Sequence, residues 1–204
     1  MSEALQDAQL VTAACQGDWD AFEALQARLE PGIRRFVRRL SGPSAEDDIV
    51  QEVFIGLFLN LARINPPENV RPYVFRMARN RCYDELRSAG RREVLSLDEE
   101  PVQVWVSYAS ATRHSEPPPD ELTHWLLLHL DVQTAIDQLP ELQQQALILY
   151  AEEGLSYAEV AEVMGVSIGT IKSRIHHAKQ SLRRLLPPAT RAALEQEFSP
   201  MRQK

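Results

Sequence analysis

The sequence predicts an all-α fold made of two small helical domains joined by a flexible linker. Apolar residues recur at steps of three and four through most of the chain, the spacing of one helix face, while strand-type alternation is scarce. Residues 93–120 are acidic and rich in Pro, a composition that does not form a compact core. We therefore expect one domain at 8–92, a linker at 93–120, a second domain at 121–187 and a C-terminal tail at 188–204.

The charge of the chain is unevenly distributed. The whole sequence is acidic, with a formal net charge of −7 and a pI near 5.3. Residues 63–92 nevertheless hold eight Arg against three acids, and residues 166–186 hold five Lys or Arg and no acid. Because phosphates respond to local charge, two basic patches on an acidic chain predict contacts with nucleic acid.

Several other classes of protein are not indicated. Cys15 and Cys82 lie far apart without paired spacing, so we expect neither a disulfide framework nor a metal site, and no cofactor. No paired carboxylates, Ser-His-Asp set or glycine-rich phosphate loop stands out, so we do not expect an enzyme. The sequence has no secretion signal and no apolar run near the ~20 residues of a membrane span, which predicts a cytoplasmic protein without membrane insertion.

Residues 8–40 are expected to form at least two helical pieces, because Gly17-Asp18 interrupts the apolar spacing. Residues 41–44 form a turn, and Ser44 can cap the helix that follows. A basic cluster on the second piece either contacts DNA or forms a solvated face: Arg34, Arg35, Arg38 and Arg39.

The helix expected at 45–64 carries more apolar surface than one core requires. Acids occupy its first turn, where the helix dipole favours anions. Residues 53–61 are apolar nearly all round, although a helix that faces a single core needs only one apolar stripe. Either the excess forms a surface that docks a partner, flanked by Asp48, Gln51 and Glu52, or the helix is fully buried in its own bundle.

The helix expected after residue 70 combines cations with aromatic residues. A stiff loop at 65–69, with paired Pro residues, precedes it. Its arginines project away from an apolar side, and Tyr73 and Phe75 lie near its start. This combination suits single-stranded DNA, because phosphates are neutralised and unstacked bases can stack on aromatic rings. A basic surface helix with core aromatics is the alternative.

Beyond the linker, helices are expected at 122–130, 132–139 and 142–150. The linker itself is expected to be extended. His114, His124 and His129 have no companion ligands at metal spacing, so they are interpreted as ordinary surface or interface residues.

Residues 155–186 contain two helical patterns that meet at a short break. Ser156 can cap the first, which ends at Met164, and Gly165 suits the left-handed position that closes it. Ser167 can cap the second, whose basic face lies opposite a buried stripe of Ile171, Ile175, Ala178, Leu182 and Leu185. This is the helix-turn-helix pattern, whose second helix lies in the DNA major groove. A helical hairpin with a solvated basic face is the alternative.

Three segments together resemble a bacterial sigma factor of the extracytoplasmic function (ECF) group. The family's helix that docks on the polymerase clamp is similar to SAEDDIVQEVFIGLF. Its helix for recognising and melting the minus-10 element is similar to RPYVFRMARNRCYDELRS. Its sigma-four domain, which reads the minus-35 element, is similar to LPELQQQALILYAEEGLSYAEVAEVMGVSIGTIKSRIHHAKQSLRRLL. The order and separation of the segments also match, over roughly residues 9–186.

The resemblance implies a sigma-two domain at 8–92, a sigma-four domain at 121–187 and three sets of site residues. Contacts to core RNA polymerase are implied for Asp48, Gln51, Glu52, Ile55 and Phe58. Contacts to the minus-10 element are implied for Asn69, Arg71, Tyr73, Arg76, Arg79, Asn80 and Arg81. Contacts to the minus-35 element of promoter DNA are implied for Thr170, Lys172, Ser173, Arg174, His176, His177 and Lys179.

The resemblance also implies an anti-sigma factor as a further partner. Trp105, Tyr108 and Trp125 either bind such a regulator or pack irregularly. His177 and Tyr150 occupy positions at which members of the family often have a basic residue. The resemblance therefore does not imply which minus-35 sequence is recognised. The runner-up function is a stand-alone regulator of the LuxR type, which explains residues 155–186 but leaves the two N-terminal segments without roles.

Overall fold

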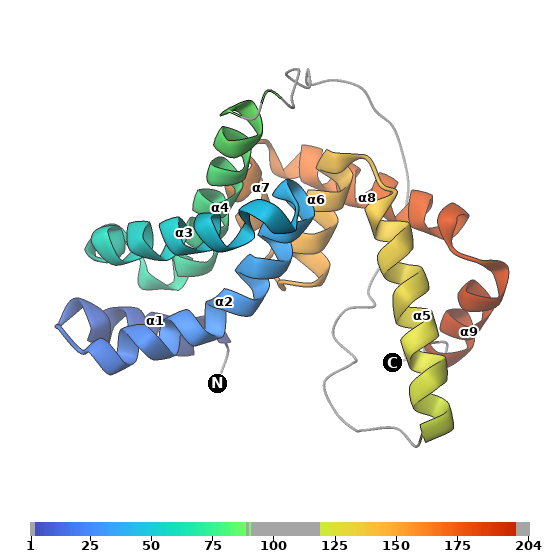
Figure 1. The fold of residues 1–204 in the computed structure, drawn as a ribbon, viewed down its shortest axis with the longest axis horizontal. Helices are drawn as coiled ribbons and strands as arrows, with labels where there is room; N and C mark the ends of the chain where they lie inside the picture. Colours follow the sequence, from blue (N-terminus) through green and yellow to red (C-terminus); the bar gives the residue numbers. More distant parts are fainter. Residues whose placement is uncertain (1–2, 89, 91–118, 199–204) are drawn as a thin grey trace. The chain divides into compact units, whose positions relative to one another are not determined.

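The computed structural model describes residues 3–88, 90 and 119–198, and every regular element in these ranges is helical (Figure 1). The predicted all-α class is confirmed for this part of the chain. By their backbone contacts the helices fall into two compact units, α1–α4 with α7, and α5, α6, α8 with α9. The helices are α1 (Glu3–Cys15), α2 (Trp19–Ser41), α3 (Glu46–Asn60), α4 (Val70–Ser88), α5 (Pro119–Asp137), α6 (Glu141–Ala151), α7 (Tyr157–Met164), α8 (Ile168–Leu185) and α9 (Pro188–Phe198), with 3-10 turns η1 (Pro43–Ala45), η2 (Leu61–Arg63) and η3 (Pro67–Asn69).

The break between α1 and α2 lies where the sequence predicts it. Gly17 adopts a φ of +96°, and Asp18 then caps α2 by accepting a hydrogen bond from the N–H of Ala21 at 3.0 Å. α2 continues through Pro31 and packs against α1, α3 and α4 (Figure 1). It therefore supplies the centre of this bundle, with a buried stripe of Phe22, Leu25, Leu29, Ile33, Phe36, Val37 and Leu40.

The start of α3 differs from the prediction. Ser44 does not cap it, because Pro43 begins a 3-10 turn that takes up Ser44 before α3 starts. Glu46, in the first turn of α3, is only 4% exposed and accepts hydrogen bonds from Arg34, at 3.2 Å, and from Arg38. The bond from Arg38 is the main reason that the pKa of Glu46 lies below its ordinary value. Two of the four α2 arginines thus anchor α3.

The aromatic residues near the start of α4 divide between core and surface. Phe75 is buried, and its ring packs edge-to-face on Phe36 of α2 with 5.6 Å between the centroids. α4 also approaches α3 closely at Gly56, where a Cβ atom would overlap the end of the Met77 side chain. Of the two alternatives for the aromatic residues of this helix, packing in the core is therefore the correct one for Phe75.

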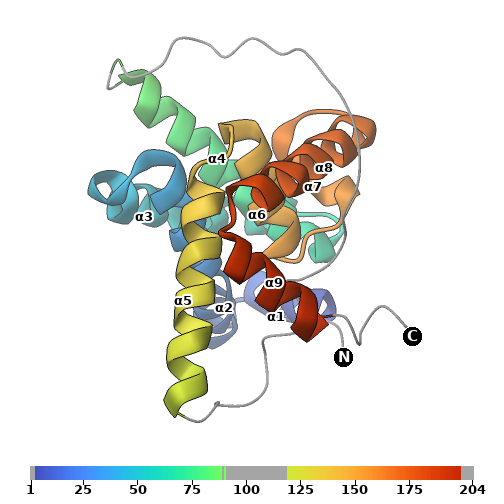
Figure 2. The same ribbon diagram turned by 90° about the vertical axis from the view of Figure 1, so that its right-hand side faces the viewer.

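α5 and the C-terminal segment depart from the prediction. α5 is one helix rather than two, because neither Gly nor Pro lies within 121–137 to interrupt it. It includes the last two residues of the predicted linker. The predicted tail contains a helix, α9, which turns back toward α5 (Figure 2). The Thr190 hydroxyl donates a hydrogen bond to the Asp131 carboxylate of α5.

α8 is buried only along its first three turns. Ile171, Ile175 and Ala178 are covered, and α8 packs against α6 and α5. Leu182 is half-buried and Leu185 is 38% exposed, so the prediction of a continuous buried stripe is wrong over the last turn. α6 has 11 residues and α8 has 18, and the shorter helix cannot cover the full length of the longer one.

Some predictions fall on parts of the chain that the structure does not describe. Trp105, Tyr108 and His114 lie outside the described residues, as do the side chains of His124 and Trp125. Within the described ranges, no helix combines the length and apolar character needed to cross a membrane.

Candidate protein and nucleic-acid interfaces

α3 presents apolar side chains on two opposite sides. Its inner side, with Val53 and Leu57, is fully buried in the bundle. On the outer side Ile55 is 52% exposed, Phe58 49% and Leu59 71%. This exposure excludes the fully buried helix that the sequence left open, and it leaves an apolar surface available to a partner.

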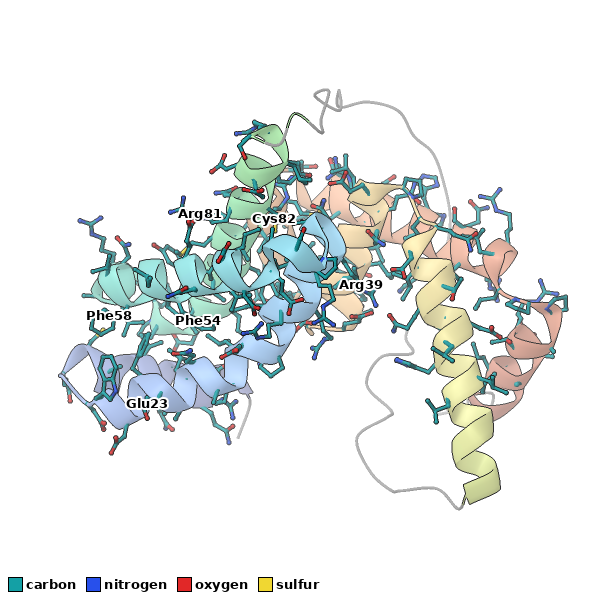
Figure 3. All side chains as sticks on the ribbon, viewed as in Figure 1. Glu23, Arg39, Phe54, Phe58, Arg81 and Cys82 are labelled. Atoms are coloured by element: carbon teal, nitrogen blue, oxygen red, sulfur yellow. The ribbon has the colours of Figure 1, made fainter. Side chains whose placement is uncertain are left out.

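A groove runs beside this surface between α2 and α3. Phe58 of α3 packs edge-to-face on two aromatic rings of α2, with centroid distances of 5.5 Å to Trp19 and 5.2 Å to Phe22. Phe54 and Phe58 lie on the side of α3 toward α2 (Figure 3). The groove has a volume of about 500 Å³ and is lined by apolar side chains together with Gln26, Glu30, Arg34, Asp47 and Gln51. Arg34 forms ion pairs with both acids of this lining, Glu30 and Asp47.

The predicted minus-10 residues of α4 lie in different environments. Asn80 and Arg81 are exposed, and Arg81 forms an ion pair with Glu52 of α3 at 3.3 Å (Figure 3). Tyr73 is half-buried, with the Arg76 guanidinium 5.7 Å from its ring centroid. Residues 73–81 of α4 therefore carry an exposed amide, cations and a half-buried aromatic ring.

Tyr83 is a site residue that the sequence reasoning missed. The guanidinium of Arg79 lies over its ring at 4.5 Å from the centroid, and an Nη of Arg79 donates to the Tyr83 hydroxyl at 3.4 Å. The signal was its position four residues after Arg79, the helical spacing at which side chains meet. Tyr83 thus holds one of the predicted DNA-contacting cations in place.

Arg71 is held by a buried carboxylate rather than directed into solvent. Its Nε donates to Oδ2 of Asp7 at 2.8 Å, while Arg28 donates to Oδ1 at 2.7 Å. The side chain of Asp7 is 0% exposed. Sequence reasoning missed Asp7, although an acid four residues before the buried Val11 occupies a position on the apolar side of α1. Asn69 is half-buried at the end of η3, just before α4.

The ends of α7 and α8 that flank the predicted turn are closed by local capping. The Ser156 side chain accepts from the N–H of Glu159, whose carboxylate accepts from the N–H of Ser156 in return, a complete capping box. Gly165 closes α7 in the left-handed conformation with φ +67°. Ser167 then caps α8 by accepting from the N–H of Thr170 at 3.1 Å. The three predicted capping and turn positions, at Ser156, Gly165 and Ser167, are confirmed.

The predicted minus-35 residues lie on the less buried side of α8. Lys172 is exposed, whereas the two histidines are half-buried with ring centroids 5.4 Å apart. The other half-buried members are Thr170, Ser173, Arg174 and Lys179. His176 and His177 are therefore only partly accessible on the face of α8 that lies opposite the buried stripe.

The Lys179 side chain of α8 lies against α6. Its Nζ is 5.1 Å from the ring centroid of Tyr150. Partial burial lowers the pKa of Lys179 below its ordinary value. Lys179 therefore ties α8 to α6 through its position over the ring. Among the described residues, no group of three or more His, Cys, Asp or Glu side chains is placed to hold a metal ion.

Two family models match the chain in the order of these interfaces. The model of Sigma-70 region 2 matches residues 25–92, which include α3 and α4. The model of Sigma-70 region 4 matches residues 129–182, which include α6 and the helix-turn-helix. These matches define a protein of the sigma-70 class. They also account for both N-terminal segments, so the LuxR-type alternative is not supported.

Individual relatives narrow the class. The ECF sigma factor EcfG of Rhodopseudomonas palustris is 34% identical over 157 residues, which are 76% of this chain and 80% of EcfG. The ECF sigma-E factor of Haemophilus influenzae is 30% identical over 192 residues, 92% of this chain and 99% of that protein. A third relative, SigE of Mycolicibacterium smegmatis, is matched over only 56% of its length. The chain belongs to the ECF RNA polymerase sigma factors, and it directs transcription initiation.

A solved structure supports the same assignment. The sigma factor RpoE of Bartonella quintana, in complex with the anti-sigma factor NepR, matches with a TM-score of 0.57 and 25% identity. The match covers 80% of this chain and 95% of that one.

Proposed function

We propose that this sigma factor divides initiation among three surfaces. The exposed apolar surface of α3 binds core RNA polymerase, the loop at 65–69 with α4 captures and opens the minus-10 element, and α8 reads the minus-35 element. The sigma-two domain at 8–92 and the sigma-four domain at 121–187 carry these tasks. The protein acts in the cytoplasm with the polymerase, which supplies the chemistry of RNA synthesis.

The observation that carries the polymerase assignment is the exposure of Ile55, Phe58 and Leu59 on a helix whose other side is already buried. Fully burying one such side chain contributes about 1.5–3 kcal/mol, so three together supply enough free energy to anchor a partner. Asp48, Gln51 and Glu52 are exposed beside them. The carboxylate of Asp48 favours a partner with basic groups, whereas Glu52 already pairs with Arg81.

Placing Lys at both Ile55 and Leu59 is expected to weaken binding to core polymerase by at least about tenfold, because two charges would have to be desolvated in the interface. Binding is measured by titrating labelled core polymerase with the purified full chain. Leu5→Lys on α1, at a side chain that is 50% exposed, is the matched control and keeps wild-type affinity. Wild-type affinity of the double variant, with an unchanged melting temperature, removes α3 from the interface.

The minus-10 assignment rests on the exposed amide of Asn80, which lies between Arg79 and Arg81 on the same helix as the half-buried ring of Tyr73. Extruding a base costs a few kcal/mol, and stacking on an aromatic ring returns roughly 1–3 kcal/mol. Tyr73 supplies such a ring, and Arg76, Arg79 and Arg81 supply positive charge for the strand that leaves the duplex. Tyr73 is only half-buried, so part of its side chain is accessible.

The minus-35 assignment rests on the capped helix-turn-helix and on the basic side chains on the surface of α8. In helix-turn-helix proteins the N-terminal part of the second helix contacts base edges. Thr170, Lys172 and Ser173 occupy that part of α8, whereas Arg174, His176 and His177 extend the surface toward the phosphates. Lys179, positioned over Tyr150, adds positive potential near the DNA backbone.

Affinity for the minus-35 element is expected to rise as the pH falls from neutral toward the acidic range. Partial burial, then His177 and Lys179, lower the pKa of His176 below its ordinary value of 6.5, so its ring is neutral in the free protein at pH 7. Phosphates favour the charged ring, so the complex takes up a proton that the free protein lacks. Uptake of one proton raises the affinity by at most about tenfold for each pH unit that the pH falls.

The pH effect is measured by titrating a minus-35 duplex between pH 7.5 and pH 5.5 at constant ionic strength. His176→Gln retains a polar side chain and should flatten the profile, whereas His177→Gln should leave a residual slope. A His176→Gln profile that matches the wild type would show that this ring does not sense the DNA charge.

An anti-sigma factor is the regulator that we propose for this chain. The similar sigma factor of Bartonella quintana was solved with one bound. The largely apolar groove between α2 and α3 offers a surface on which such a regulator could exclude polymerase.

A further inference from the structure

Asp7 joins three helices of the first bundle through one buried carboxylate. One oxygen accepts from Arg28 of α2 and the other from Arg71 of α4, at 2.7 and 2.8 Å. The Arg28 side chain is 34% exposed and that of Arg71 20% exposed, while Asp7 is fully buried. A charged hydrogen bond of this length, with its acceptor out of water, holds its donor in a defined direction.

The carboxylate lies next to the segment that we assign to minus-10 capture. Arg71 is the second residue of α4, and η3 with the loop at 65–69 directly precedes it. α1, which carries Asp7, packs against η3 as well as against α2 and α4. α1 precedes the residues matched by the region 2 family model, so neither that model nor the resemblance assigns Asp7 a role.

We propose that Asp7 is a positioning residue for minus-10 strand capture, acting through Arg71. The pair directs the Arg71 guanidinium toward α1, away from the phosphates, and fixes the start of α4 so that the loop at 65–69 keeps the shape that receives a base. This inference rests on the proposed role of that loop and α4. It differs from the role that the resemblance implies for Arg71, a direct contact with DNA.

The two roles predict different behaviour in a double-mutant cycle. If Asp7 acts through Arg71, then Asp7→Asn, Arg71→Gln and the double variant should show the same loss of capture, roughly tenfold, because each breaks the same pair. If Arg71 contacts DNA directly, Arg71→Gln should be defective, while Asp7→Asn, which releases the guanidinium, should bind DNA as well as or better than the wild type.

Arg28→Gln is the matched control, because it removes the other Arg of the same carboxylate. Arg28 lies on α2 and has no part in the loop or in α4. It should lower the melting temperature as Arg71→Gln does, but leave strand capture unchanged. A purely structural role of the cluster would make the two arginine variants equally defective in capture.

The experiment uses holoenzyme with the full chain and a promoter that carries 2-aminopurine at the captured minus-10 position. Fluorescence reports extrusion of the base, and closed-complex affinity is measured on the same DNA. Equal loss in Asp7→Asn and Arg71→Gln, with normal capture by Arg28→Gln, supports the proposal. Wild-type capture by Asp7→Asn overturns it. Asn80→Ala distinguishes failure of the positioning role from failure of the proposed function of α4. If Asn80→Ala captures the strand normally, the proposed function of α4 fails and the positioning role fails with it.

Discussion

Gly165→Val is expected to abolish recognition of the minus-35 element while leaving the bundle of α1–α4 folded. Gly165 has a φ of +67°, a region that a β-branched residue enters only with strain. A residue held in such a conformation costs about 1–3 kcal/mol, and a small helical unit has little stability to lose. If the turn between α7 and α8 adjusts to relieve the strain, α8 no longer keeps the orientation required for the groove.

The Gly165 variants are compared by binding to a minus-35 duplex and by circular dichroism during heating. A Cβ atom at Gly165 would have no neighbour within 4 Å, so the expected effect comes from backbone strain rather than from a clash. Gly165→Asn is therefore the matched control, because Asn tolerates the left-handed region and should retain most of the binding. Equal binding by Gly165→Val and Gly165→Asn would contradict the requirement for a left-handed turn.

Asn80→Ala and Lys172→Ala are expected to fail at different steps of initiation. Asn80→Ala should leave closed-complex binding nearly unchanged and lower strand opening about tenfold, because an amide hydrogen bond to an extruded base is made only after opening. Lys172→Ala should weaken the closed complex and, if its ammonium group meets a phosphate, reduce the salt slope by about one.

Strand opening is followed by permanganate reactivity of unpaired thymines, and closed-complex affinity by titration at several salt concentrations. Gln180→Ala serves as the control on α8, because Gln180 is exposed and outside the proposed contact set. A similar loss of both steps in both variants would rule out separate tasks for α4 and α8.

The local geometry of the helix-turn-helix could be predicted almost completely. Ser156, Gly165 and Ser167 occupy the predicted cap and turn positions, because these depend on backbone conformation and on neighbours within four residues. Helix period, charge distribution and segment order were sufficient for the all-α class and the ECF family. The prediction for Ser44 failed even though it was local, since Pro43 had already started a 3-10 turn.

Burial and ion pairing were decided by tertiary packing. The sequence left α3 either buried or partly exposed, and only the placement of α2 and α4 around it leaves Ile55 and Leu59 uncovered. The buried length of the apolar stripe on α8 was overestimated, because the spacing of apolar residues does not indicate how long the covering helix is. Lys179 and Tyr150 are 29 positions apart, and their contact follows from the packing of α6 on α8.

The sequence by itself determined the helices, most of their caps, the two basic patches and the family, because each of these depends on residue type and short-range spacing. The tertiary structure decided which charged side chains form ion pairs within the protein. Asp7 and Arg71 are separated by 64 positions, and nothing in their own neighbourhoods indicates that they meet. Their pairing arises because α1 packs on η3 and α4, where a buried carboxylate must find cationic partners.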